Sequence, residues 1–123
     1  MILIDTSALV GSLCGRRESE DRLDQFMAAG ERFRLSTITL YEWYRGPRSE
    51  TELEWQELLF PSDKALPFGY AESVVAAEIY RRVKSPRRRE IDIAIAATAI
   101  SRDVALWTIN RRDFEDIPGL RLL

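Results

Sequence analysis

Four acidic residues in this sequence stand where a folded chain could bring them together as oxygen ligands. Asp5 and Asp113 each follow a short apolar run. Glu42 lies among bulky apolar neighbours, and Asp92 opens a long apolar segment. A buried carboxylate must face water or a cation, because an unpaired buried charge is costly. Carboxylates that converge also repel one another, so a cluster of them is stable when a cation neutralises it.

The chain has no histidine and one cysteine, Cys14, which limits the chemistry that it can perform. Catalytic triads with histidine, histidine bases and zinc or iron sites with histidine or thiolate ligands are excluded. Hard oxygen ligands select Mg²⁺ or Mn²⁺ instead. Such ions activate a bound water and stabilise charge on a phosphate during its displacement. A single cysteine also forms no internal disulfide, which fits a cytosolic setting.

Asp5 and Asp92 each have an ordinary structural explanation beside the functional one. Asp5 precedes Thr6 and Ser7, and residues of these three types are good helix caps. Asp92 would lie in the first turn of a helix, where the helix dipole favours an anion.

The other two acids have such explanations as well. Glu42 could form a salt bridge with Arg45 or Arg48. Asp113 closes the segment Asn110-Arg111-Arg112-Asp113, which could cap a short helix. The functional hypothesis therefore depends on several separate segments delivering oxygen ligands to one place.

The elements that would position these acids alternate along the chain. Short apolar runs typical of buried parallel strands are separated by longer segments with helical periodicity. This pattern predicts one three-layer α/β domain over residues 1–123, with a mostly parallel sheet. Sites in such sheets form at the carboxyl ends of the strands, where Asp5 and Asp113 fall. The expected strands are 1–5, 33–36, 65–68, 105–109 and 120–123, and the expected helices are 7–13, 18–29, 38–45, 50–60, 70–83 and 90–102.

Four segments in order closely resemble the PIN-domain family, and within it the VapC-type ribonuclease toxins of prokaryotic toxin–antitoxin pairs. They are MILIDTSALV, STITLYE, DIAIAATA and WTINRRDF, and together they extend the resemblance over essentially the whole chain. The resemblance implies a PIN-like fold and an endoribonuclease with Mg²⁺ or Mn²⁺ held by Asp5, Glu42 and Asp92. It also implies a homodimer that acts on RNA and is inhibited by a small antitoxin protein, whose tail enters the active-site groove.

The resemblance leaves the fourth ligand open. Some members of the family place an acid where this chain has Asn110, and others place it three residues later, at Asp113. Asp113 is the favoured charged ligand here, with Asn110 as a neutral ligand or a positioning residue. Thr6 and Thr108 are expected to support the ligands by hydrogen bonding.

Arginines are concentrated just before Asp92 and again beside Asp113. Six of the nine residues from 81 to 89 are Lys or Arg. Such a segment could be a solvated helix end, or it could bind the phosphates of RNA beside an otherwise repulsive acidic site. The expected RNA-binding residues are Arg87, Arg88, Arg89, Arg111 and Arg112.

Four aromatic residues lie on two successive expected helices: Trp43, Tyr44, Trp55 and Phe60. Most of them are expected in the core. Any that are exposed could instead form a groove that grips an antitoxin helix, because aromatic side chains often anchor interfaces.

Other classes of protein fit less well or remain as alternatives. No apolar run is long enough to span a membrane, and the N-terminus does not read as a signal peptide, so a cytoplasmic protein is expected. A haloacid-dehalogenase-like phosphatase would need a second aspartate two residues after Asp5, where this chain has Ser7. A catalytically inactive PIN-like binding module and a metal-dependent DNA nuclease both remain open.

Overall fold

Three short parallel strands form the central sheet, in the order β2-β1-β3. The middle strand is β1 (Ile2–Ile4), flanked by β2 (Phe33–Arg34) and β3 (Ala105–Trp107). Both pairings are parallel. The computed structural model describes all 123 residues.

The sheet separates two hydrophobic cores, because successive side chains of a strand point to opposite faces. Ile2 and Ile4 of β1 pack with Trp107 of β3 in one core. Leu3 and Leu106 belong to the other. The sheet is therefore the middle of three layers, which confirms the predicted α/β class.

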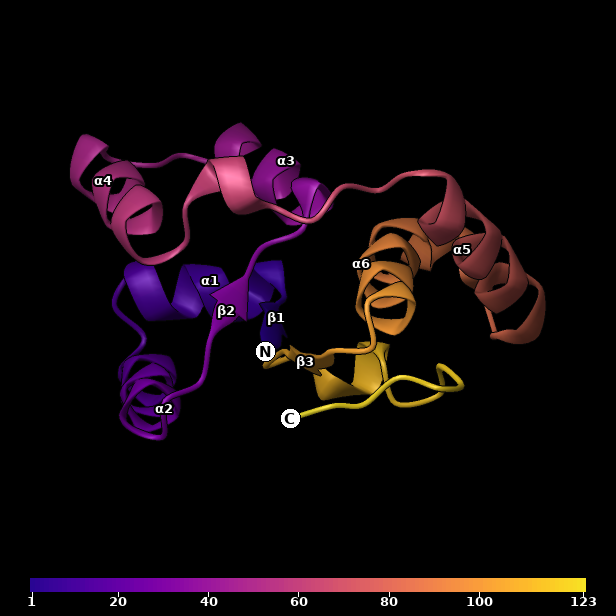
Figure 1. Cartoon of the computed structure of the whole chain (residues 1–123). Coiled ribbons are helices and arrows are strands. Elements are labelled where there is room, and N and C mark those ends of the chain that lie inside the picture. Colours follow the sequence, from indigo (N-terminus) through magenta and orange to yellow (C-terminus); the bar gives the residue numbers. More distant parts are fainter.

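Helices cover both faces of the sheet (Figure 1). The first core is built with helices from the N-terminal half of the chain, and the second with the long helices that follow. The helices are α1 (Thr6–Leu13), α2 (Arg17–Ala28), α3 (Thr37–Arg45), α4 (Glu50–Leu59), α5 (Tyr70–Arg82) and α6 (Glu90–Ser101). Three short 3₁₀ helices complete the fold: η1 (Ser62–Lys64), η2 (Pro86–Arg89) and η3 (Arg111–Asp113).

Local sequence signals explain where the helices begin and end. Ser36 caps α3 by accepting a hydrogen bond from the Thr39 backbone N–H, and Gly46-Pro47 ends that helix. Ser49 and Glu52 form a reciprocal capping box at the start of α4. All six helices have both ends within one residue of the predicted bounds.

Two predicted strands are reduced to single bridges. Residues 65–68 contribute only the pairing of Leu66 with Ser36, and residues 120–123 only that of Leu122 with Leu106. Pro67 follows Leu66 directly, and proline has no N–H to donate to a ladder, so pairing cannot continue there. The 3₁₀ helices η1 and η2 were not predicted, whereas η3 lies in the segment 110–113 that was offered as the cap of a short helix, although no side chain caps it.

Among the helices of this fold, none combines the length and the apolar character needed to cross a membrane.

Candidate active site

An open pocket of about 480 Å³ lies where β1 and β3 end. Parallel strands bring their carboxyl ends to the same edge, so the residues after each strand meet there. The pocket is lined by Asp5, Thr6, Ser7, Val10, Gly11, Cys14, Arg16, Glu42, Asp92, Ile109 and Asn110. Three of the four expected acids thus face one space, although 87 residues of sequence separate the first from the last.

Asp5 is the most deeply buried of these acids, with 3% of its surface exposed. It occupies the N-cap position of α1 but makes no side-chain cap. Its Oδ2 instead accepts hydrogen bonds from Ser7 Oγ at 2.6 Å and Thr108 Oγ1 at 2.7 Å. Oδ1 accepts none, so half of this carboxylate remains available in the pocket. The capping explanation of Asp5 is therefore wrong.

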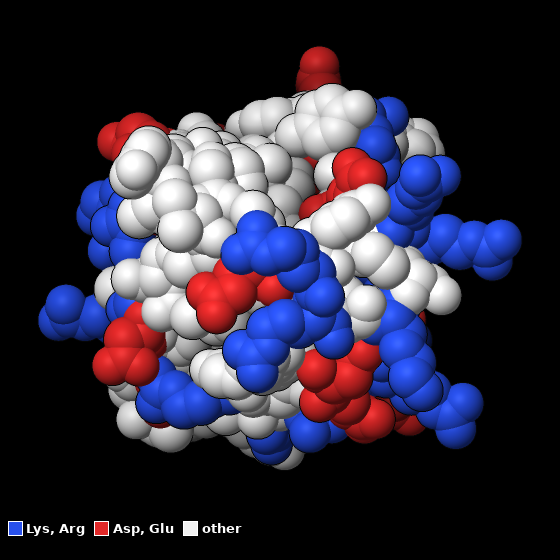
Figure 2. Space-filling view, turned by 90° about the vertical axis from the view of Figure 1, so that its right-hand side faces the viewer, with Lys and Arg blue, Asp and Glu red and all other residues white.

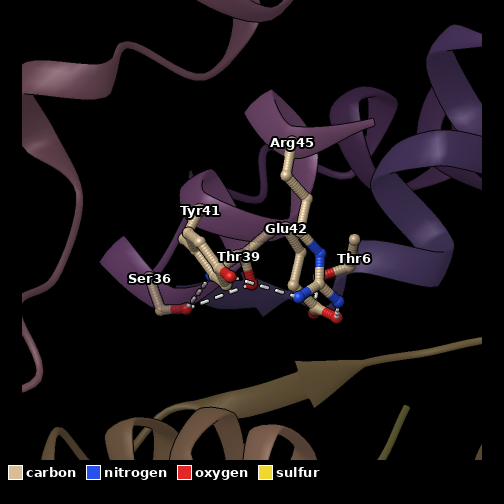
Figure 3. Close-up of polar contacts among 6 residues, drawn as sticks. All are labelled: Thr6, Ser36, Thr39, Tyr41, Glu42 and Arg45. Atoms are coloured by element: carbon tan, nitrogen blue, oxygen red, sulfur yellow. Dashed lines mark hydrogen bonds and ion pairs between the residues drawn. The ribbon is translucent and has the colours of Figure 1, made fainter. Parts of the chain in front are cut away.

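Helix α3 is fixed to the sheet by the residue that lies one turn before Glu42. Thr39 bonds to the Ser36 cap, and its Oγ1 also donates to the backbone carbonyl of Ile4 at 3.5 Å. Residues three apart share one face of a helix. The contact that anchors Thr39 to β1 therefore turns Glu42 toward the same end of the strand (Figure 3).

Glu42 has two partners at the pocket (Figure 3). Thr6 Oγ1 donates to Glu42 Oε1 at 2.5 Å, and Arg45 Nη2 lies 3.3 Å from Oε2. The Arg45 side chain is about half exposed, so this ion pair contributes little stability. The predicted alternative of a salt bridge to Arg45 is confirmed, while Arg48 donates to the Trp43 carbonyl instead. Glu42 thus forms the ion pair with Arg45 and also lines the pocket.

Asp92 lies in the first turn of α6 and accepts no hydrogen bond from the protein. Burial raises the pKa of Asp92 from the ordinary 3.8 to about 6, and the negative charges of Asp5, Asp113 and Glu42 add to the rise. The positive charge of Arg89 opposes this shift in pKa only in part. Asp5, Asp113 and Glu42 are therefore close enough to act electrostatically on Asp92.

Asn110 and Asp113 occupy different places at this edge of the sheet. Asn110 lines the pocket, and its backbone N–H donates to Thr108 Oγ1 at 3.0 Å. Asp113 is exposed and lines a neighbouring hollow with Asn110, Arg111 and Arg112. The charge of Asp113 reaches Asp92, but its side chain stands outside the main pocket.

The donor chemistry of the pocket suits a hard divalent cation, since it offers carboxylates, hydroxyls and an amide. As the side chains stand, no three acidic groups form a cluster that could enclose one ion. Mg²⁺ commonly uses only one or two carboxylates and keeps several waters. The free Oδ1 of Asp5 and the unpartnered Asp92 fit that requirement.

Two of the five arginines expected to bind RNA are engaged within the protein. Arg89 forms a two-pronged ion pair with Asp116, at 2.9 and 2.5 Å, and donates to the carbonyls of Lys84 and Asp113. This pair holds the pKa of Asp116 below its usual range. Arg111 donates to the Leu123 carbonyl.

The other three, Arg87, Arg88 and Arg112, are free of ion pairs. Arg87 and Arg88 line a hollow beside Tyr80. Figure 2 shows basic and acidic side chains interleaved on the face viewed from the α5 side, without one continuous basic field.

The four aromatic residues divide between core and surface. Trp43 and Phe60 are buried in the first core, whereas Tyr44 and Trp55 are each about half exposed. The prediction that most of this set is buried is right for two of the four.

Six of the lining residues were missed by the sequence analysis, and Ser7 and Arg16 are the two among them that bring a hydroxyl and a charge. Ser7 bonds to Asp5 Oδ2, and Arg16 is the only basic residue that lines the pocket. The spacing Asp5-x-Ser7 at the end of a strand was a usable signal for Ser7. No signal in the sequence pointed to Arg16, because its position depends on how the turn before α2 folds.

Comparison with known proteins defines the family. Residues 2–120 match the PIN domain, and the chain belongs to this family. It is 32% identical over 123 residues to a protein named ribonuclease VapC19 of Mycobacterium tuberculosis, covering 98% of each chain. A protein named ribonuclease VapC of Rickettsia bellii is 37% identical over 75 residues, or 59% of this chain and 54% of its own length.

Solved structures share the fold. A toxin–antitoxin complex from Klebsiella pneumoniae superposes with a TM-score of 0.76 at 24% identity, covering all of this chain and 96% of that one. VapBC2 of Rickettsia felis, solved with a DNA fragment from its promoter, gives 0.74 at 19% identity, with 100% and 98% coverage. These likenesses establish a PIN-like α/β fold.

Proposed function

We propose that this chain is a divalent-metal-dependent endoribonuclease and the toxin of a toxin–antitoxin pair. The observation that carries the proposal is the convergence of Asp5, Glu42 and Asp92 on one open pocket. The relatives named ribonuclease VapC support the assignment to RNA.

The residues that would hold Mg²⁺ or Mn²⁺ are Asp5, Glu42 and Asp92, with Asp113 as an outer fourth acid. When bound, such an ion activates water and stabilises the charge that develops on a phosphate. Ser7 and Thr108 hold Asp5 in one orientation by bonding to Oδ2. Thr6 and Arg45 orient Glu42 in the same way.

Arg87, Arg88 and Arg112 are the basic residues best placed to meet RNA outside the pocket. Each lies close in sequence to a pocket acid or to Asp113, and none has an internal partner that it would have to leave. Arg89 and Arg111 are proposed to support this surface mainly by fixing η2 and η3. Neutralising Arg87 and Arg88 together should lower the salt dependence of RNA binding.

The test is cleavage by the purified protein of matched single-stranded RNA and DNA of the same sequence, with Mg²⁺, with Mn²⁺ and with EDTA. The decisive variant is Asp5→Asn, which keeps the shape of the side chain but removes its charge. Loss of metal stabilisation of the transition state should lower the rate by roughly 100-fold or more. The matched control is Asp21→Asn, because Asp21 is exposed on α2 and lies outside the pocket.

Each result separates the proposal from its alternatives. RNA cleavage that needs metal and is lost in Asp5→Asn alone would support the proposed function. Cleavage of DNA in preference to RNA would favour the DNA nuclease. No cleavage of either, with no metal binding by calorimetry, would favour an inactive PIN-like binding module.

The antitoxin, the homodimer and the cytoplasmic setting belong to this proposal as well. Apolar side chains exposed on α3 and α4 support an antitoxin surface there: Tyr41, Tyr44, Trp55, Leu58 and Leu59. The solved complexes of similar fold also include toxin–antitoxin pairs. The homodimer rests on family resemblance, and analytical ultracentrifugation of the free chain would test it.

A further inference from the structure

One basic residue lines the pocket, Arg16, which follows α1 in the chain, whereas Asp5 precedes that helix. A polyanionic strand that enters this space meets Asp5, Glu42 and Asp92, which repel it. Arg16 is the only cation among the eleven lining residues. Among the side chains that line the pocket, Arg16 is therefore the only one that can attract the strand by its charge.

Helix α1 connects the acidic end of the pocket with Arg16. Ser7, Val10, Gly11 and Cys14 all line the pocket, and their spacing of three and four residues places them on one face of the helix. The rise of 1.5 Å per residue makes the path from Ser7 to Cys14 about 10 Å long. The pocket therefore extends along α1, with carboxylates beside the start of the helix and Arg16 beyond its end.

The backbone of Arg16 is fixed by a tight turn. Gly15 adopts a positive φ of 95°, which L side chains rarely do, and lets the chain reverse after α1. The Arg16 N–H then donates to the Gly11 carbonyl at 2.9 Å. The Arg16 carbonyl accepts from Ser19 and Glu20, which starts α2. The base of the side chain is thus held in place from both sides.

The guanidinium of Arg16, by contrast, is available. Its side chain is 56% exposed, and its one ionic partner is Glu18 at 3.6 Å, a side chain that is 88% exposed. An ion pair between two such exposed groups contributes little and is easily exchanged. Arg89, whose side chain is only 16% exposed and paired with Asp116, shows the opposite arrangement.

We propose that Arg16 is a substrate-binding residue that contacts a phosphate of the RNA strand flanking the scissile phosphodiester. This inference rests on the proposed function. The strand would lie along α1, with the phosphodiester that is cut at the carboxylates and a neighbouring phosphate at the guanidinium. Arginine suits this task because its planar fork can donate two hydrogen bonds to one phosphate.

A contact away from the reacting phosphate stabilises the ground state and the transition state alike. Its loss therefore raises KM and leaves kcat nearly unchanged. The affinity for RNA should fall about tenfold at low salt, as expected for one charge-assisted contact. The slope of log affinity against log salt should fall by about 0.7, the value for one phosphate contact on a single strand.

The test compares Arg16→Gln, Arg16→Lys and Arg17→Gln. Arg17 is the matched control because it is the adjacent arginine, is exposed and does not line the pocket. Binding of a single-stranded RNA oligonucleotide is measured by fluorescence anisotropy over about 50 to 200 mM salt. The Asp5→Asn background with Mg²⁺ keeps the RNA intact, and thermal melts confirm that each variant is folded. KM and kcat are measured in the otherwise wild-type chain.

The expected result is weaker binding, a smaller salt slope and a raised KM for Arg16→Gln, with the slope restored in Arg16→Lys. Equal binding, slope and KM for Arg16→Gln and Arg17→Gln would overturn the inference. If the wild type cleaves no RNA, the proposed activity is wrong, while the binding comparison still decides the role of Arg16.

Discussion

Two carboxylates of the same pocket differ in the hydrogen bonds that they accept. Asp5 is buried but receives two hydroxyl donors on one oxygen. Asp92 receives none and has three acidic groups near it. Hydrogen bonds to an anion favour its charged form, whereas burial and like charges disfavour it. The carboxylate of Asp92 therefore serves the proposed metal site but lowers the stability of the metal-free fold.

Asp92→Asn should stabilise the metal-free protein at neutral pH. The pKa of Asp92 is about 6 in the folded protein and near 3.8 in the unfolded chain, so the folded state binds the proton more tightly. Stability is therefore lost as pH rises from about 4 through 6, and the loss is complete above about 7. After allowance for partial solvent screening, the variant should gain about 1 kcal/mol at neutral pH and show a flatter profile.

Urea unfolding across this pH range, with EDTA present, measures the effect. Asp21→Asn serves as the control for loss of an exposed carboxylate. Added Mg²⁺ should reverse the order, because an ion bound to the native state stabilises the wild type only. A variant that is less stable than wild type in EDTA at neutral pH would contradict this account of Asp92.

At the scale of elements, the packing of α1 against α2 shapes the pocket. Gly11 faces Ser19 of α2 so closely that an added Cβ would lie 2.5 Å from Ser19 Oγ. Ser19 is buried, and its hydroxyl has no hydrogen-bond partner. The missing side chain at position 11 thus lets α2 approach and leaves the floor of the pocket open beside Arg16.

Gly11→Ala should destabilise the fold by about 1 kcal/mol. Overpacking of this kind costs about 1–3 kcal/mol, which exceeds the gain of roughly 1 kcal/mol from replacing a helical glycine with alanine. The effect should be smaller in a Ser19→Ala background, where the clashing hydroxyl is absent. Chemical denaturation of the four members of this double-mutant cycle gives the coupling energy.

A loss of stability at position 11 that Ser19→Ala leaves unchanged would contradict the packing argument.

At the scale of the whole molecule, helices α3 and α4, which carry exposed apolar residues, lie apart from the long helix α5 (Figure 1). Tyr44 and Trp55 are 51% and 48% exposed, beside buried Trp43. A large aromatic that is half exposed can anchor a partner, because burying it removes much apolar area from water.

Trp55→Ala should weaken binding of the antitoxin by about 2 kcal/mol, or about 30-fold, as for a central aromatic of an interface. Titration calorimetry with the antitoxin measures the affinity, and thermal melts check that the fold is intact. Tyr70→Ala is the control, because Tyr70 is 87% exposed but lies on α5. Equal affinity of the two variants for the antitoxin would show that the antitoxin does not bind at Trp55 on α4.

The sequence by itself determined the six long helices and the kind of chemistry that the site can perform. Helix bounds follow from signals within a few residues, such as Gly46-Pro47 after α3 and the capping pair Ser49 and Glu52, and they were predicted within one residue. The types of residue at the strand ends, together with the absence of histidine, restricted the site to oxygen ligands. Interactions between residues close in sequence decide these features, so short stretches of the sequence are enough to predict them.

Only the tertiary structure decided which of several possible partners each side chain has. Thr108 bonds to Asp5 across 103 positions and Arg89 pairs with Asp116 across 27, while Arg16 joins the pocket through the turn after α1. Adjacent Trp43 and Tyr44 differ in burial because the packing of α3 turns one toward the core and the other outward. Contacts between distant segments arise from the packing of whole elements, and residue types and spacing alone do not specify them.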